Sequence, residues 1–279
     1  MPSVLVRARP GDPLPIDPVS KSTLPLPDYD FYMGTYEVTN AQYAHFLNSV
    51  ASVDDYYLYD IKMGLTDLDR GIGGITRDGE SGDYSYSVVP ELANHPVTYV
   101  SFWDAARYVN WLSTGSTEKG VYTMMPKQDD NKNEPIQRNQ DAFDDGAFAL
   151  PSHEEWLKAG LYSSASDPTL YAFPTQSDSI GVEQANIEGS SFSGLAPVGS
   201  FDHPSPHGTY DQAGNAWEWL DDLSEFEQSK LPARFRKGGS FLHPVNRNSM
   251  SSMSPGKPRA ASDQGSDWGF RVVRKRTDN

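Results

Sequence analysis

One short stretch of the chain, residues 208–219, gathers the side chains best suited to hold a cation. It carries Asp211, Asn215 and Glu218 among three aromatic residues and two glycines. Acids that are buried beside tryptophans have to be ion-paired, hydrogen-bonded or bound to a cation, because an uncompensated buried charge is costly. The stretch therefore predicts either a tight hydrogen-bonded turn or a site for a hard cation such as Ca²⁺, which prefers carboxylate and carbonyl oxygens.

The histidines offer weaker support for metal or acid–base chemistry. His203 and His207 have the i, i+4 spacing of a helical metal pair, but Pro204 and Pro206 disfavour a helix there. We interpret the six histidines as structural or exposed: His45, His95, His153, His203, His207 and His243. No nucleophile elbow or phosphate-binding loop accompanies them.

Composition excludes several classes of function. The 279-residue chain has no cysteine, which removes disulfides, thiolate metal sites and cysteine nucleophiles. Its net charge of −15 argues against nucleic acid as a partner, because phosphate binding needs a basic face. No apolar run approaches the roughly 18 residues of a membrane helix, so we expect no membrane insertion. An acidic surface suits an ion-rich exterior.

Three segments carry the signature of a helix start, the capping box. The pairs are Thr39 with Gln42, Ser101 with Asp104, and Ser152 with Glu155. We predict short strands over residues 4–7, 31–34, 97–100 and 148–150, and surface loops over 60–83 and 127–145. Few helices among many short strands indicate an α+β fold.

The domain organisation is predicted to be simple. Residues 1–30 contain seven prolines and are interpreted as an N-terminal strap. Residues 31–279 show no internal repeat and no clear linker, so we predict one domain there.

Seven motifs, in order along the chain, resemble those of the formylglycine-generating enzyme (sulfatase-modifying factor) family. They are YEVTNAQY at 36–43, HPVTYVS at 95–101, LPSHEEW at 150–156, APVG at 196–199, GNAWEW at 214–219, KGGSF at 237–241 and WGFRV at 268–272. The resemblance runs from about residue 31 to 273. It implies the C-type-lectin-like fold of that family, with short twisted sheets, few helices and much ordered loop.

The same resemblance argues against the family's oxidase activity in this chain. That activity uses two cysteines that follow the Gly-Gly-Ser motif, and their positions fall on His243 and Asn248. Neither residue supplies a thiolate. An alternative that stays open is a metal-dependent oxidoreductase with an unrecognised centre near His243.

The resemblance also implies structural calcium sites. One set falls on Asp211, Gly214, Ala216 and Glu218. A second falls on Asn186, Ile187 and Phe192, with Ser190 at the position of an expected aspartate. Calcium at these sites would hold loops in place and would not take part in chemistry.

The leading hypothesis is a non-catalytic, calcium-stabilised, lectin-like module that binds a protein or a glycan. The family's cleft falls on Phe241, Leu242, His243, Asn246, Arg247, Asn248, Met250 and Met253, with Trp103 and Trp268 at its border. Aromatic, methionine and arginine side chains form adaptable binding surfaces. The fold is shared with variable proteins of diversity-generating retroelements, whose variable residues lie between the Gly-Gly-Ser and Gly-Phe-Arg motifs. We therefore expect the protein on a cell or virion surface or outside the cell.

Overall fold

The computed structural model describes residues 1–8, 23, 25–124, 136–163, 169–224, 233–244 and 256–277. Over these residues the chain is an α+β fold with two four-stranded sheets, two small two-stranded ladders, short helices and long ordered loops. The predicted fold class is confirmed.

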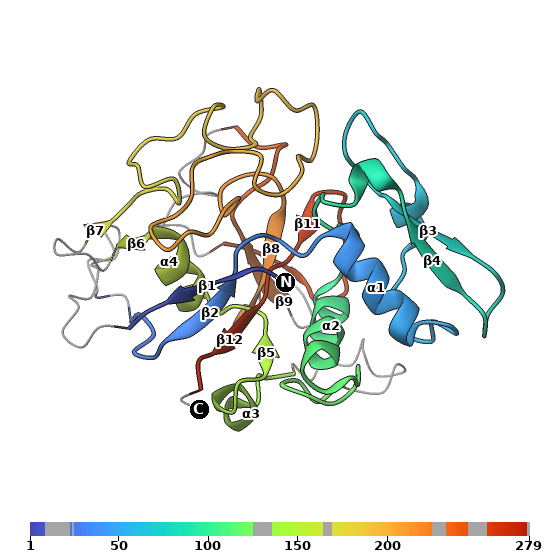
Figure 1. Ribbon diagram of the computed structural model, residues 1–279. Coiled ribbons are helices and arrows are strands. Elements are labelled where there is room, and N and C mark those ends of the chain that lie inside the picture. The colour runs from blue at the N-terminus through green and yellow to red at the C-terminus, as the bar shows by residue number, and fades with distance from the viewer. Residues whose placement is uncertain are drawn as a thin grey trace.

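The first sheet brings the two ends of the chain together. Its strands, in spatial order, are β1 (Ser3–Val6), β2 (Phe31–Gly34), β12 (Val273–Lys275) and β5 (Phe148–Ala149). All neighbours in it are antiparallel, and Figure 1 shows β12 between β2 and β5. Three of the predicted strands are confirmed here within a residue or two at their ends. The N-terminal segment thus contributes β1 to the sheet.

The second sheet carries the motifs that the sequence singled out. Its spatial order is β10 (Lys257–Ala260), β9 (Ala233–Lys237), β8 (Trp217–Ser224) and β11 (Trp268–Gly269). The first three strands are antiparallel, and β11 runs parallel to β8. Because β11 comes from the WGFRV motif and β8 from GNAWEW, the sheet joins two motifs that are about 50 residues apart.

Two predictions about loops and strands are wrong. Residues 60–83 hold β3 (Ile75–Asp78), which pairs with β4 (Ser85–Val88), and also the 3₁₀ helix η1 (Ile61–Gly64). Residues 127–145 hold α3 (Gln140–Asp144). Glycine and acidic residues concealed these elements, which are short.

The remaining small elements are η2 (Pro90–Leu92), β6 (Tyr162–Ser163) and β7 (Thr169–Leu170).

Residues 97–100 form no strand, although a strand was predicted. The Val97 N–H donates to the Val38 carbonyl at 2.9 Å, whereas the Tyr99 N–H donates to the Gly265 carbonyl at 2.9 Å. Tyr99 has a φ of 59°, which turns the chain out of the extended conformation. The backbone groups of this apolar segment are therefore satisfied by several loops and not by one neighbouring strand.

The three capping boxes are confirmed at the starts of α1 (Asn40–Val50), α2 (Phe102–Thr114) and α4 (His153–Leu161). In each, the cap side chain accepts from the third helical N–H and the third side chain returns the bond. Helices α1 and α2 pack together through aromatic residues, with Tyr43 stacked on Tyr108 at 5.9 Å between ring centroids. No helix in the described ranges is both long and apolar enough to cross a bilayer.

Candidate functional site

The 208–219 stretch forms a strained turn that ties two other loops together. Asp211 and Asn215 have φ values of 62° and 56°, in the left-handed region that non-glycine residues rarely adopt. Gly214 has a φ of 81°, and a Cβ there would lie 2.2 Å from the Asn186 carbonyl oxygen. The Asn215 N–H donates to that same carbonyl at 2.7 Å, and the Gly214 N–H donates to Gly238 at 2.9 Å.

Glu218, in β8, is an ion-paired carboxylate at the centre of the molecule. Its side chain and that of Arg271 both have 0% relative exposure. Arg271 donates to it twice, from Nη2 at 2.6 Å and from Nε at 2.7 Å. The Trp156 indole N–H donates to the same carboxylate at 2.8 Å. The other donors of Arg271 reach the carbonyls of Gly34 and Tyr210 at 3.0 and 2.8 Å. This bidentate pair links both sheets and the turn.

Two further carboxyl groups, of the buried Glu37 and the half-buried Asp211, lie beside this ion pair. Asp211 accepts from the Gly199 N–H at 2.6 Å, and Glu37 accepts from the Asn215 amide at 3.1 Å. The second oxygen of Glu37 has no hydrogen-bond partner. Burial raises the pKa of Asp211 to about 6, and burial together with Asp211 raises the pKa of Glu37 well above its usual range.

The charge balance of this acidic cluster leaves room for a cation. The carboxyl groups of Glu37, Asp211 and Glu218 share the one guanidinium of Arg271, and the raised pKa values of Glu37 and Asp211 favour their protonated forms, so either protons or a bound cation would balance the charge here. A hollow of about 10 Å³ lies against Asp211, the size that one water molecule or small ion needs. Of the set Asp211, Gly214, Ala216 and Glu218, only Asp211 lines this hollow, and Glu218 is already bound by Arg271. In the described part of the chain, no three acidic or histidine side chains converge as a metal cage.

In the second predicted calcium set, a hydroxyl group contacts two of the oxygens. Asn186 donates its amide to the Gly194 carbonyl at 2.8 Å and to the Asn215 side-chain oxygen at 2.9 Å. The Ser190 hydroxyl lies 2.7 Å from the Asn186 side-chain oxygen and 3.3 Å from the Phe192 carbonyl. Those are two of the oxygens that the resemblance gives to calcium. Asn186, Ile187, Ser190 and Phe192 offer a cation no carboxylate, and hydrogen bonds already satisfy this loop.

His243 is oriented by Ser240 and Asp267, an arrangement that sequence reasoning missed. The Ser240 hydroxyl lies 2.6 Å from Asp267 and 2.9 Å from His243 Nδ1. The Ser240 hydroxyl donates its one hydrogen to the Asp267 carboxylate, so it can only accept a hydrogen bond from His243. Nδ1 of His243 therefore carries the imidazole proton, and the lone pair is on Nε2. Burial lowers the pKa of His243 and favours this neutral form. The serine lies between acid and imidazole, so the trio is not the nucleophilic Ser-His-Asp relay.

One face of the second sheet is made of tryptophans and cations, and we call it the tryptophan–arginine face. Its exposed members are Lys257 and Arg259 and Trp268 is half-buried, whereas its other members are at most 2% exposed. Residues that pair directly across a ladder share a face, and alternate residues of a strand return to it. The registers place these residues on it: Trp217, Trp219, Trp268, Arg234, Arg236, Lys257 and Arg259. Arg236 lies at its centre, with its guanidinium 3.5 Å from the ring centroid of Trp268 and 5.2 and 5.5 Å from those of Trp217 and Trp219.

Arg236 is buried without a hydrogen-bonded partner at two of its donors. Its relative exposure is 2%, and among the described residues Nε and Nη1 have no hydrogen-bond acceptor. Burial lowers its pKa, as does Arg259 nearby. A guanidinium normally finds acceptors when it is buried, because leaving charged donors unsatisfied costs more than leaving neutral ones. The π faces of three tryptophans are its main compensation.

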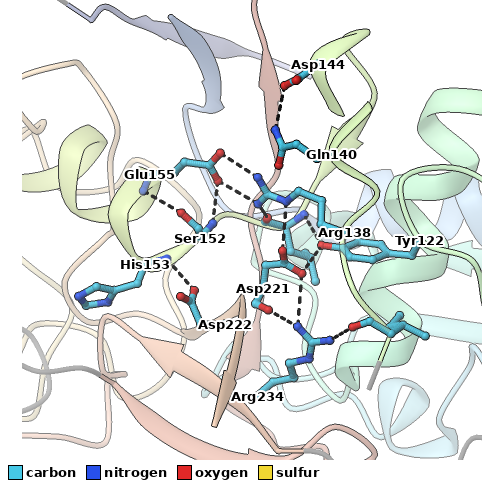
Figure 2. A network of polar contacts seen from close by, with 12 residues as sticks. Tyr122, Arg138, Gln140, Asp144, Ser152, His153, Glu155, Asp221, Asp222 and Arg234 are labelled. Atoms are coloured by element: carbon cyan, nitrogen blue, oxygen red, sulfur yellow. Dashed lines mark hydrogen bonds and ion pairs between the residues drawn. The ribbon is translucent and has the colours of Figure 1, made fainter. Parts of the chain in front are cut away.

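The neighbouring Arg234 has acceptors at both terminal nitrogens, although its Nε, like that of Arg236, has none among the described residues. It donates to the carbonyls of Asp221 and Ile136 and forms an ion pair with the Asp221 carboxylate at 3.4 Å. Figure 2 shows the network that this pair joins, in which Arg138 bridges Glu155 at 2.9 Å and Asp221 at 3.1 Å. This network fixes the start of α4 against β8. Arg236, two residues further along β9, has no comparable ion pair in the described part of the chain.

The structure places the other predicted ligand residues as follows. Phe241 is 5% exposed and packs in a small apolar cluster, Leu242 is 48% exposed, and His243 and Trp268 are half-buried. Trp103 is 5% exposed and belongs to the main core, not to a surface. Asn246, Arg247, Asn248, Met250 and Met253 lie outside the described residues.

Comparisons with known proteins agree with the motifs. The family described as the sulfatase-modifying factor enzyme 1-like domain matches residues 12–276. The formylglycine-generating enzyme of Bos taurus is 25% identical over 255 residues, which cover 76% of this chain but only 57% of that enzyme.

Solved structures show the same fold. The crystal structure of CarF superposes with a TM-score of 0.62 at 22% identity and covers 99% of both chains. Treponema denticola variable protein 1 superposes with a TM-score of 0.60 at 18% identity and covers 98% of this chain and 95% of its own. The seven motifs, the two sheets and the match over residues 12–276 lead to one conclusion: the chain belongs to the sulfatase-modifying factor enzyme 1-like domain family.

Proposed function

We propose that this protein is a non-catalytic, lectin-like binding module, and that its ligand surface is the tryptophan–arginine face with the adjoining His243 loop. The observation that carries the proposal is Arg236, which is 2% exposed and lacks acceptors for Nε and Nη1. A fold gains no stability from a buried guanidinium in that state. Such a group is explained where a ligand completes its contacts, as at the desolvated centres of binding surfaces.

The family's oxidase chemistry finds no support in this chain. The two thiol positions are occupied by His243 and Asn248, and the sequence holds no cysteine at all. The ligand would be a protein or a glycan, met outside the cell or at a cell or virion surface. This location is in keeping with the net charge of −15.

A place among the variable ligand-display proteins of retroelements fits the same fold. One structural relative is itself a variable protein. Residues 245–255, between the motifs that bound the variable segment in such proteins, contain Asn246, Arg247, Asn248, Met250 and Met253. A reverse transcriptase gene and a template repeat next to the coding region would support this assignment, and their absence would contradict it.

The binding function is tested by an unbiased screen of the whole protein against peptide and glycan libraries. Ligands that bind wild-type protein are measured again with Trp268→Ala. The matched control is Tyr57→Ala, which removes another aromatic residue, 71% exposed, on a distant loop. We expect loss of binding with the first variant only. Equal binding by both variants, or no ligand at all, contradicts the proposal.

A second function, a metal-dependent oxidoreductase, is favoured by one observation. Asp267 and Ser240 orient the His243 imidazole so that Nε2 carries the lone pair, as outer-shell carboxylates do for metal-binding histidines. The test is metal analysis of protein incubated with Fe²⁺ or Cu²⁺. Stoichiometric metal that is lost in His243→Ala supports this function, and metal content equal in both proteins contradicts it.

We also propose that the first predicted set, Asp211, Gly214, Ala216 and Glu218, holds a structural Ca²⁺. Three carboxyl groups that share one guanidinium, the unpartnered oxygen of Glu37 and the small hollow beside Asp211 support it. Calcium added to chelator-treated protein should raise the Tm, and Asp211→Asn should abolish the rise. A Tm that does not respond to calcium contradicts the site.

A further inference from the structure

We propose that the tryptophan–arginine face binds an extended acidic peptide segment, an inference that rests on the proposed binding function and names its ligand. The argument starts from the register of β9 and β10. Lys257 lies directly opposite Arg236, and Arg259 lies directly opposite Arg234. Like charges directly opposite in an antiparallel ladder repel and destabilise the pair. Two such pairs in succession concentrate four cations on one sheet face.

Only part of this positive charge is balanced within the protein. Arg234 is paired with Asp221 and with two carbonyls. Arg236 has no acceptor at Nε and Nη1, and Lys257 and Arg259 are exposed on the edge strand. Asp263 and Asp267 are the acids that act on Arg236, and Asp267 is already hydrogen-bonded to Ser240. An anion is therefore the missing component of this face.

The rest of the molecule makes the face selective. The chain carries 38 acidic and 23 basic residues, so a cluster of four cations stands out against an acidic protein. Charge complementarity of this kind steers an acidic partner to the patch and repels it elsewhere.

The geometry favours a peptide in extended conformation. Lys257 and Arg259 are alternate residues of one strand, so their Cα atoms are about 6.7 Å apart. Acidic side chains at alternate positions of an extended peptide repeat at the same spacing. Trp268, half-buried at the far side of the sheet, adds an aromatic surface. Tryptophan and arginine are also the residue types that dominate the energetics of protein–protein interfaces.

The experiment measures fluorescence anisotropy of a labelled peptide in which glutamate alternates with threonine, with the full chain, at an ionic strength of about 0.1 M, where the Debye length is about 10 Å. We compare wild-type protein with the double variant Lys257→Glu/Arg259→Glu. Both positions are exposed, and each glutamate would lie opposite an arginine across the ladder, so the variant should have a Tm no lower than that of the wild type, which is measured alongside. We expect affinity to fall at least about tenfold, since two attractive pairs become repulsive.

The matched control is Arg7→Glu/Lys119→Glu, which changes the net charge equally at two exposed positions away from the second sheet. Its affinity for the peptide should stay within about twofold of the wild type, because charges beyond a Debye length are screened. An equal loss in both double variants overturns the inference, because net charge alone would then explain binding.

A further arm separates this inference from the binding function itself. Dextran sulfate, a sulfated glycan, replaces the peptide. If the glycan binds through Lys257 and Arg259 and the peptide does not, the acidic-peptide inference is overturned while the binding function stands. If ligands from the unbiased screen bind equally to the wild type and to Lys257→Glu/Arg259→Glu, the inference again falls alone. If no ligand binds in any arm, both fall.

Discussion

Arg271 and Arg236 are both buried, but their surroundings differ in one respect. The side chain of Arg271 has 0% exposure and donates hydrogen bonds to the Glu218 carboxylate and to the carbonyls of Gly34 and Tyr210. Arg236 has 2% exposure and meets three indole rings, without an acceptor at Nε and Nη1. The donors of Arg271 are satisfied by groups within the protein, whereas two donors of Arg236 lack an acceptor among the described residues.

The comparison teaches where stability and where recognition reside in this fold. The Arg271 region joins the turn at residues 208–219 to both sheets, so its charges serve the fold. Arg236 lies on β9, next to the strand β8 that carries Glu218. The charges of the tryptophan–arginine face nevertheless cost free energy in the unbound protein. The following experiments test whether the two arginines differ as this contrast requires.

The largest effect is expected from Arg271→Met. The substitution leaves Glu218 buried without its cation, which should cost about 3–5 kcal/mol of unfolding free energy. Urea denaturation measures the loss. Arg274→Met, at an exposed position of β12, is the control and should change stability by less than about 1 kcal/mol. A small loss with Arg271→Met would remove the structural role of this arginine.

A second test concerns Asp222, a carboxylate that has no such bidentate partner. Burial, with Glu154 nearby, raises its pKa to about 7. Its folded pKa exceeds its unfolded value, so its contribution to stability is complete below about pH 4 and is lost as the pH rises through 7. Asp222→Asn keeps an oxygen for the His153 N–H, which now donates to Asp222 at 2.6 Å, but cannot titrate.

The expected result is a flatter profile of unfolding free energy against pH for Asp222→Asn. Relative to this variant, the wild type should lose roughly 1–3 kcal/mol between pH 4 and pH 8, since one pKa unit corresponds to about 1.4 kcal/mol. Exposed Asp55→Asn should leave the profile unchanged. Parallel profiles for the wild type and Asp222→Asn would show that Asp222 is not perturbed.

Arg236→Met should have the opposite sign to Arg271→Met. Removal of an unpaired buried charge in favour of an apolar side chain of similar length should stabilise the protein by about 1–2 kcal/mol. The same variant should bind the alternating glutamate peptide more weakly. Denaturation and anisotropy are both required. A variant that is destabilised by as much as Arg271→Met would erase the contrast between the two arginines.

The smallest effect is expected at Ser190. Ser190→Ala removes the hydroxyl that contacts Asn186 and Phe192, which should cost about 1 kcal/mol, with or without calcium. Ser190→Asp restores the carboxylate that the family pattern has there. A calcium-dependent rise in Tm in Ser190→Asp beyond that of the wild type would show that the serine closed this second site.

Local chemistry made much of the fold predictable. A capping box lies within four consecutive residues, so all three were identified from sequence, and β2 was predicted at its full extent of residues 31–34. The β3–β4 ladder and α3 were missed because their polar, glycine-rich surroundings resemble loops. The apolar run at 97–100 was misread because its backbone partners, such as Val38 and Gly265, are distant in sequence.

The candidate site was only half visible. The stretch with Asp211 and Glu218 was identified correctly as a place where acids need compensation, but its cation, Arg271, is 53 residues downstream of Glu218. The tryptophan–arginine face was missed altogether. The sequence did carry a signal for it, because cations alternate at Arg234 and Arg236 and again at Lys257 and Arg259. These four side chains share one face only when β9 and β10 pair.

The sequence by itself determined the family, the α+β class, the helix starts and the absence of cysteine chemistry, because these depend on neighbouring residues or on composition. Tertiary structure alone decided how the charges are used. The folded chain brought Arg271 to Glu218 from 53 residues downstream, and strand pairing left Arg236 among tryptophans of two other strands. Whether a buried charge is compensated depends on residues that are far away in the sequence, and only the folded chain brings those residues within hydrogen-bonding distance.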